Sequence, residues 1–158
     1  MKKRIFQSCA IVVLGLAATQ TIASAQDDDT HGIEGAWITN ITVHDCQNPN
    51  VVIRTVRSLS LFIHDGSFTE AGATVTGLVN PRTSSVGVWR HAEGKTYNST
   101  FQFIGLNPAG AFATMLRVTR TIQLDGDHWT SKETVHVFDV NGNLLNTLCS
   151  EAAATRAP

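Results

Sequence analysis

The sequence is poor in charge and lacks the patterns by which several enzyme classes are recognised. Only 16% of its 158 residues are Asp, Glu, Lys or Arg. There is no Gly-x-Ser-x-Gly elbow for an activated serine and no glycine-rich phosphate loop. No Cys-x-x-Cys motif and no Cys/His spacing typical of a zinc site are present. These absences exclude the common hydrolase, nucleotide-binding and zinc signatures, so the sequence predicts neither a cofactor nor a metal.

Long hydrophobic runs are also missing. The one apolar run, Ile11 to Ala18, is too short to cross a membrane. It lies between the basic Lys2-Lys3-Arg4 and the small residues Ala23-Ser24-Ala25, which is the order of a secretory signal peptide. We therefore predict that residues 1–25 are removed and that the remaining chain is secreted or periplasmic, without an integral membrane anchor.

The predicted mature chain has few basic residues. Residues 1–25 hold three of the twelve Lys and Arg and none of the thirteen Asp and Glu, so the formal net charge becomes 9 minus 13, or −4. This charge disfavours nucleic acid and anionic membranes as partners. Residues 26–33, with Asp27-Asp28-Asp29, have little to bury and are expected to form a flexible lead-in. Residues 34–158 are then a single domain, long enough for a core.

Cysteine is scarce, with two residues left after the signal peptide. Cys46 and Cys149 are widely separated, and an even pair in an oxidising compartment predicts one disulfide. Two free buried thiols are the alternative.

From Ala36 onward the hydrophobic pattern alternates with a period of two, and no long stretch has the period of a helix. Turn residues divide the pattern into eight segments. An all-β, eight-stranded antiparallel up-and-down barrel suits this order, because closure removes exposed edges and places the first strand beside the last. The predicted strands are Ala36 to Cys46, Arg54 to His64, Phe68 to Thr76, Val86 to His91, one around Tyr97 to Phe103, Phe112 to Leu124, Trp129 to Val140 and Leu144 to Thr155.

The sixth and seventh strands show the clearest pairing. If Gly126-Asp127 are the central residues of a hairpin turn, each residue pairs with the one that brings the two numbers to a sum of 253. Leu124 then faces Trp129, and the apolar faces of both strands coincide. Arg120 is the only charged residue on the apolar face of the sixth strand, and Glu133 is the only one on the apolar face of the seventh. This register places the two residues opposite each other.

Gly35-Ala36-Trp37 opens the first predicted strand. Its Gly-x-Trp form resembles the signature of lipocalins and the wider calycin group. The resemblance implies an eight-stranded barrel whose tryptophan closes the narrow end, with a basic residue near the C-terminus packed across it. Trp37 matches the first role and Arg156 the second.

These features favour a protein that binds a small, mostly apolar molecule inside the barrel. Arg120 and Glu133 would then form a desolvated polar anchor for the ligand. The alternative is a cross-strand salt bridge of structural importance only. The wall of the ligand site is predicted to include Tyr97, Phe101, Phe103 and Leu116.

Two other functions stay open at this point. Small barrels can catalyse cyclisation, isomerisation or lyase reactions by holding an apolar substrate in one shape, with Tyr97, Arg120 and Glu133 as acid–base candidates. A second form of the enzyme hypothesis places His44 and His64 at a rim, where they would converge with Asp45, Asp65 or Glu70. The third possibility is a structural or interaction module whose interior is filled by side chains. Nothing in the sequence indicates the oligomeric state.

Overall fold

The computed structural model describes residues 32–77 and 81–158. The predicted signal peptide and residues 26–31 of the predicted lead-in lie outside this part of the chain. The described residues contain eight strands and no helix. The strands are β1 (Gly35–Asp45), β2 (Val52–Phe62), β3 (Ser67–Gly77), β4 (Ser85–Glu93), β5 (Thr96–Leu106), β6 (Phe112–Asp125), β7 (His128–Phe138) and β8 (Leu144–Arg156).

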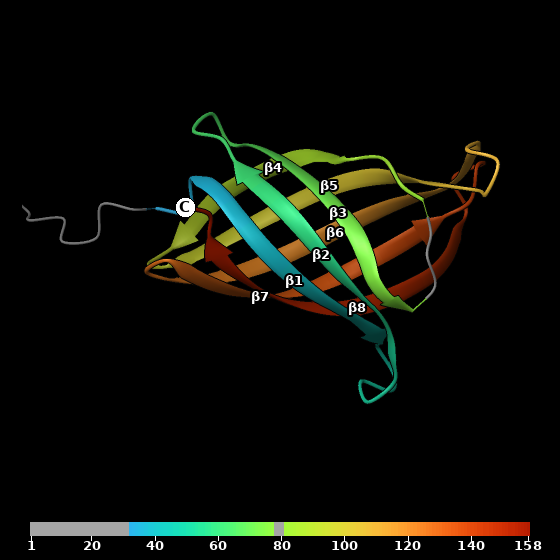
Figure 1. Cartoon of the computed structure of the whole chain (residues 1–158), viewed down its shortest axis with the longest axis horizontal. Coiled ribbons are helices and arrows are strands. Elements are labelled where there is room, and N and C mark those ends of the chain that lie inside the picture. The colour runs from blue at the N-terminus through green and yellow to red at the C-terminus, as the bar shows by residue number, and fades with distance from the viewer. Residues whose placement is uncertain (1–31, 78–80) are drawn as a thin grey trace, which may run out of the picture.

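The strands form a closed antiparallel barrel in which each pairs with the next and β8 pairs with β1 (Figure 1). The predicted fold class is therefore confirmed. β7 ends at Phe138, two residues before the predicted end at Val140. Its ladder stops there because the Asp139 carboxylate accepts hydrogen bonds from the backbone N–H groups of Asn141 and Asn143, which turns the chain.

The register predicted for β6 and β7 is confirmed. Leu124 pairs with Trp129, Val118 with Val135, and Arg120 with Glu133. Alternate residues of β6 from Leu116 to Leu124 are buried and the residues between them are exposed. The face that carries Arg120 is therefore the inner face of the barrel.

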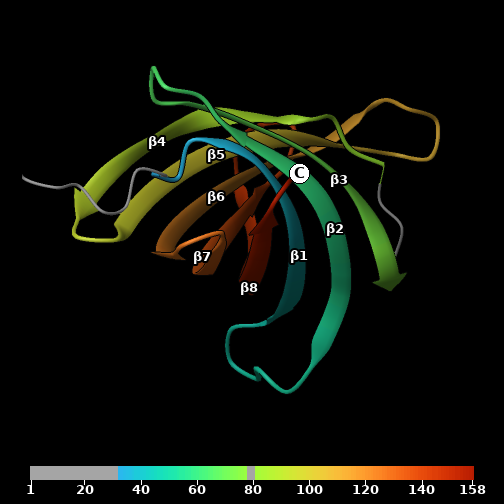
Figure 2. The same ribbon diagram turned by 60° about the vertical axis from the view of Figure 1, so that its left-hand side comes forward.

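One seam of the barrel is short. β3 pairs with β4 through only four residues, Ser67 to Glu70. No residue of β3 after Glu70 pairs with β4, and in Figure 2 the arrowhead end of β3 lies apart from β4. Val75 is an extra residue in the ladder, because Thr74 and Thr76 pair with the adjacent Val56 and Thr55 of β2. Strand β3 thus contains a bulge, and the barrel widens at this end.

The end at which β1 begins is closed by aromatic side chains. The ring of Trp37 meets the ring of Trp129 edge-on, and so does the ring of Phe62, each with 6.3 Å between the centroids. Trp37 Nε1 donates to the carbonyl of Ile33 at 2.8 Å, and Ile33 is fully buried. Ile33 therefore belongs to the core, although the sequence had assigned it to the lead-in.

Arg156 lies across the outer side of this plug. Its guanidinium carbon is 4.3 Å from the centroid of the Trp37 ring. Its Nη2 donates to the carbonyl of Gly32 and its Nη1 to the carbonyl of Glu34. The last strand thereby fastens the segment that leads into the first, and the interior is sealed at this end.

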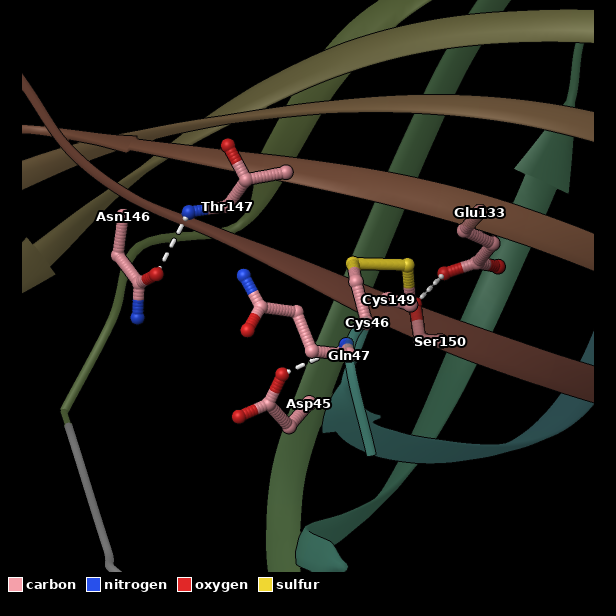
Figure 3. Close-up of a disulfide and its surroundings, with 8 residues drawn as sticks. All are labelled: Asp45, Cys46, Gln47, Glu133, Asn146, Thr147, Cys149 and Ser150. Carbon is pink, nitrogen blue, oxygen red and sulfur yellow. Dashed lines mark hydrogen bonds between the residues drawn. A yellow bond between two sulfur atoms is a disulfide. The ribbon is translucent and has the colours of Figure 1, made fainter. Parts of the chain in front are cut away.

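The predicted disulfide joins Cys46, directly after the end of β1, to Cys149 in the middle of β8 (Figure 3). Ser150, the next residue of β8, points inward and donates to Glu133 at 2.7 Å. The covalent link between the first and last strands therefore lies beside the polar interior of the barrel.

Replacing both Cys46 and Cys149 by Ser should lower the free energy of unfolding by about 4 to 5 kcal/mol in the chain-entropy view, because the two cysteines are 103 positions apart. Urea unfolding followed by tryptophan fluorescence measures the change. A reductant should lower the free energy of unfolding of the wild-type protein and leave that of the double variant unchanged. Equal stabilities of the two proteins under oxidising conditions would contradict the prediction.

Candidate functional site

The barrel holds a cavity of about 700 Å³ that lies toward the end opposite the aromatic plug. Its walls come from residues of β1, β2, β3, β5, β6, β7 and β8, from Pro81 and Arg82 between β3 and β4, and from the connection between β5 and β6. Most of the lining is apolar, and representative residues are Ile41, Val56, Leu116, Val118, Val135 and Leu148. The interior is therefore filled at one end and hollow at the other.

Five of the six residues predicted to bind a ligand line this cavity. They are Phe101, Phe103, Leu116, Arg120 and Glu133. Tyr97 is not among the lining residues. Its ring packs toward the closed end, with its centroid 5.9 Å from that of Trp89 and 5.1 Å from that of His91.

Arg120 lies deep in the cavity and is completely buried. Its Nε is 2.7 Å from Glu133 Oε1, and its Nη2 donates to Glu70 Oε2 at 3.2 Å. The Nε hydrogen is not aimed at the Glu133 oxygen, so this contact is an ion pair and not a hydrogen bond. A single guanidinium thus joins carboxylates that come from two different parts of the wall, β3 and β7.

Aromatic rings surround the same guanidinium. Its central carbon lies 4.8 Å from the ring centroid of Phe101, 5.2 Å from that of Trp129 and 5.5 Å from that of Phe68. The negative faces of aromatic rings attract a cation, most strongly where water is excluded. The rings therefore add to the two carboxylates in offsetting the cost of burying Arg120.

The sequence prediction missed the role of Glu70, which it considered only as a rim carboxylate beside histidines. Glu70 is buried, and its second oxygen accepts a hydrogen bond from Arg82 Nη2 at 3.1 Å. Ser60 also donates to Glu70, at 3.2 Å. Gly72 leaves room for Arg82, because a Cβ at that position would lie only 2.8 Å from Arg82 Nη2. Glu70 therefore bridges two arginines.

Both buried carboxylates are fully engaged. Glu133 accepts hydrogen bonds from Ser131 at 3.0 Å and from Ser150 at 2.7 Å, besides its contact with Arg120. Burial acts to raise the pKa of Glu70, but the charges of Arg120 and Arg82, with their hydrogen bonds, outweigh it. The pKa of Glu70 therefore lies below its ordinary value of 4.5, and the group is a carboxylate at neutral pH.

A third arginine, Arg54 of β2, lines the outer part of the cavity and is half-buried. Its Nε is buried without a hydrogen-bond partner. Within residues 32–77 and 81–158, no carboxylate forms an ion pair with it. Burial and the nearby charge of Arg82 lower the pKa of Arg54 below its ordinary value. Among the residues that the structure describes, Arg54 is thus a cation without a carboxylate to neutralise it.

The histidine hypothesis is wrong in its geometry. His64 follows the end of β2 near the closed end, whereas His44 precedes the end of β1 at the opposite end. His64 pairs with Glu34, at 2.9 Å, on the outer surface. The two histidines therefore do not converge. Among the described residues, no group of three or more His, Cys, Asp or Glu side chains is arranged to hold a metal ion.

No family model, no curated protein and no solved structure matches the chain. The lipocalin resemblance therefore stays a prediction. No helix in the described part of the chain is long and apolar enough to span a membrane.

Replacing Glu70 by Gln should lower the free energy of unfolding at pH 7 by about 3 to 5 kcal/mol, because the variant leaves buried arginine charge uncompensated. The depressed pKa means that ionised Glu70 stabilises the wild-type protein above the ordinary glutamate pKa, and this stability is lost as the pH falls through the folded-state value. The variant should therefore lose less stability than wild type between about pH 5 and pH 3.

Urea unfolding at several pH values checks both parts of this prediction. Glu151→Gln is the matched control, since Glu151 is exposed on β8. It should change neither the stability at pH 7 nor the acid profile by a comparable amount. Parallel acid profiles for wild type and the Glu70 variant would refute the expected role of Glu70.

The pKa of His64 should lie above 6.5, because Glu34 accepts its hydrogen bond and attracts the protonated ring, with a smaller contribution from the charge of Asp65. Titration followed by NMR of the imidazole protons measures the value. Glu34→Gln should bring the pKa back toward 6.5. A pKa unaffected by this substitution would show that the pair does not form in solution.

Proposed function

We propose that this protein binds one small, mostly apolar molecule in the cavity of the barrel and acts as a carrier outside the cytoplasm. The observation that carries the proposal is the apolar cavity of about 700 Å³. Its volume falls within the range of about 300 to 1,000 Å³ that is usual for ligand sites. Eight-stranded barrels are also wide enough to hold one small ligand.

Three further observations support a location outside the cytoplasm and a likeness to lipocalins. The Cys46–Cys149 disulfide suits a non-reducing compartment, and the signal-peptide pattern in residues 1–25 agrees with a secreted or periplasmic protein. The packing of Arg156 on Trp37 is the arrangement that the lipocalin resemblance implies. The resemblance is therefore part of the proposal.

The other two functions have less support. A filled structural module would not leave a cavity of this size. Catalysis by Tyr97, Arg120 and Glu133 would need these groups to meet at a substrate, but Tyr97 lies outside the lining. Arg120 and Glu133 are engaged with each other and with Glu70, Ser131 and Ser150.

Titration with the neutral fluorescent probe N-phenyl-1-naphthylamine tests the proposal. The wild-type protein should bind one probe molecule and increase its fluorescence. Leu116→Trp should lower the affinity about tenfold or more, because Leu116 lines the cavity and a larger ring would occupy the space of the ligand.

Thr119→Trp is the matched control, because Thr119 belongs to the same strand and is exposed on the outer face. It should bind the probe as the wild type does. Equal affinities of all three proteins, or no saturable binding by the wild type, would refute binding in the cavity. Circular dichroism checks that both variants keep the barrel.

A further inference from the structure

We infer that the ligand carries a single negative charge, most simply a carboxylate, and that Arg54 and Arg82 together hold this group in the outer part of the cavity. This inference rests on the proposed function and names the class of molecule: an apolar body with a monoanionic head group.

The first support is the charge balance inside the barrel. The charged residues that line the cavity are Arg54, Arg82, Arg120, Glu70 and Glu133. Three cations face two anions, so the lining has a formal charge of 3 minus 2, or +1. The whole chain has a formal net charge of −1. The cavity is therefore positive within a protein that is slightly negative, and one monoanion would neutralise it.

The second support is the distribution of contacts among the three arginines. Arg120 is enclosed by two carboxylates and three aromatic rings. Arg82 shares Glu70 with Arg120 and has a buried Nε without a hydrogen-bond partner. Arg54 has no ion-pair partner in the described part of the chain. The positive charge that Glu70 and Glu133 do not neutralise is therefore at Arg54 and Arg82. It is not at Arg120, which was predicted from the sequence to be the polar anchor of the ligand.

The third support is the position of Arg54 and Arg82. Arg54 is the third residue of β2, and Arg82 bridges to Gly105 near the end of β5, so both backbones belong to the wide end of the barrel. The Arg82 guanidinium packs over the Phe103 ring, 4.2 Å from its centroid, which fixes it at the cavity wall. Deeper in, Leu116, Val118 and Val135 offer an apolar surface. A ligand would thus lie with its head group outward and its apolar body inward.

The chemistry of the guanidinium favours a carboxylate. Its planar fork of N–H donors matches the two oxygens of a carboxylate, and charge-assisted hydrogen bonds are stronger than neutral ones. An arginine that is half-buried beside another cation is costly without a counter-ion. A bound carboxylate would remove that cost, whereas a neutral head group would leave it and an ammonium group would increase it.

A series of twelve-carbon ligands with different head groups tests the inference. Dodecanoate, dodecanol and dodecylamine displace N-phenyl-1-naphthylamine from the wild-type protein at neutral pH, and the displacement gives their affinities. Dodecanoate should bind about tenfold or more tightly than dodecanol, and dodecylamine more weakly than dodecanol. Arg54→Gln should remove most of the preference for dodecanoate, because it should lower the affinity for dodecanoate far more than the affinity for dodecanol.

Arg57→Gln is the matched control, because Arg57 belongs to the same strand and is exposed. It removes the same charge from the protein and should preserve the preference for dodecanoate. A wild-type protein that binds dodecanol as tightly as dodecanoate would overturn the inference, whether or not the variants fold. An equal effect of Arg54→Gln and Arg57→Gln would overturn it as well.

The outcomes separate this inference from the carrier function. If the probe and dodecanol bind in the cavity but dodecanoate has no advantage, the carrier function stands and the anion site does not exist. If the probe, dodecanol and dodecanoate all fail to bind, both proposals are wrong.

Discussion

The ion network around Arg120 is the constraint on which the interior depends. Removing a guanidinium from water costs several kcal/mol unless opposite charges and hydrogen bonds replace the lost hydration. Glu70 of β3 and Glu133 of β7 supply the charges, and neither strand is the other's neighbour. Ladder hydrogen bonds connect each strand only to the two beside it. The network therefore connects opposite walls of the barrel directly. Backbone hydrogen bonds between neighbouring strands cannot fix the shape of the interior in this way.

The same network compensates for the weakest seam. Glu70 is the last residue of β3 that pairs with β4, and its partner in the ladder is Ser85. Beyond this point Arg82 reaches back to Glu70, so an ion pair continues the contact where backbone hydrogen bonds stop. The barrel can then widen on this side without complete separation of β3 from β4. A cavity at that end and a packed aromatic plug at the other follow from this arrangement.

The hydrophobic pattern predicted the barrel and the β6–β7 register because in these strands one face is apolar almost throughout, so a slip of one residue would expose the whole set. It failed to find Glu70 and its partners because β2 is patterned in the opposite sense. Leu59 is 64% exposed, while Ser60 is 2% exposed and donates to Glu70. Periodicity identifies two faces of a strand, but a polar interior makes hydrophobicity a poor guide to which face is inside. The sequence prediction also missed Arg54. Its importance comes from the lack of an ion-pair partner among the described residues, which a hydrophobic pattern does not reveal.

The placement of charge determines how an anion would be selected. The chain is negative overall, so its distant field does not attract an anionic ligand. Charges separated by more than about 8 Å in physiological salt are largely screened, whereas charges inside a partly desolvated cavity are not. Arg54 and Arg82 would therefore act only on a molecule that has already entered. Under the proposed function, entry would depend on apolar fit and retention on the head group, so the cavity would select first for an apolar molecule and then for an anion.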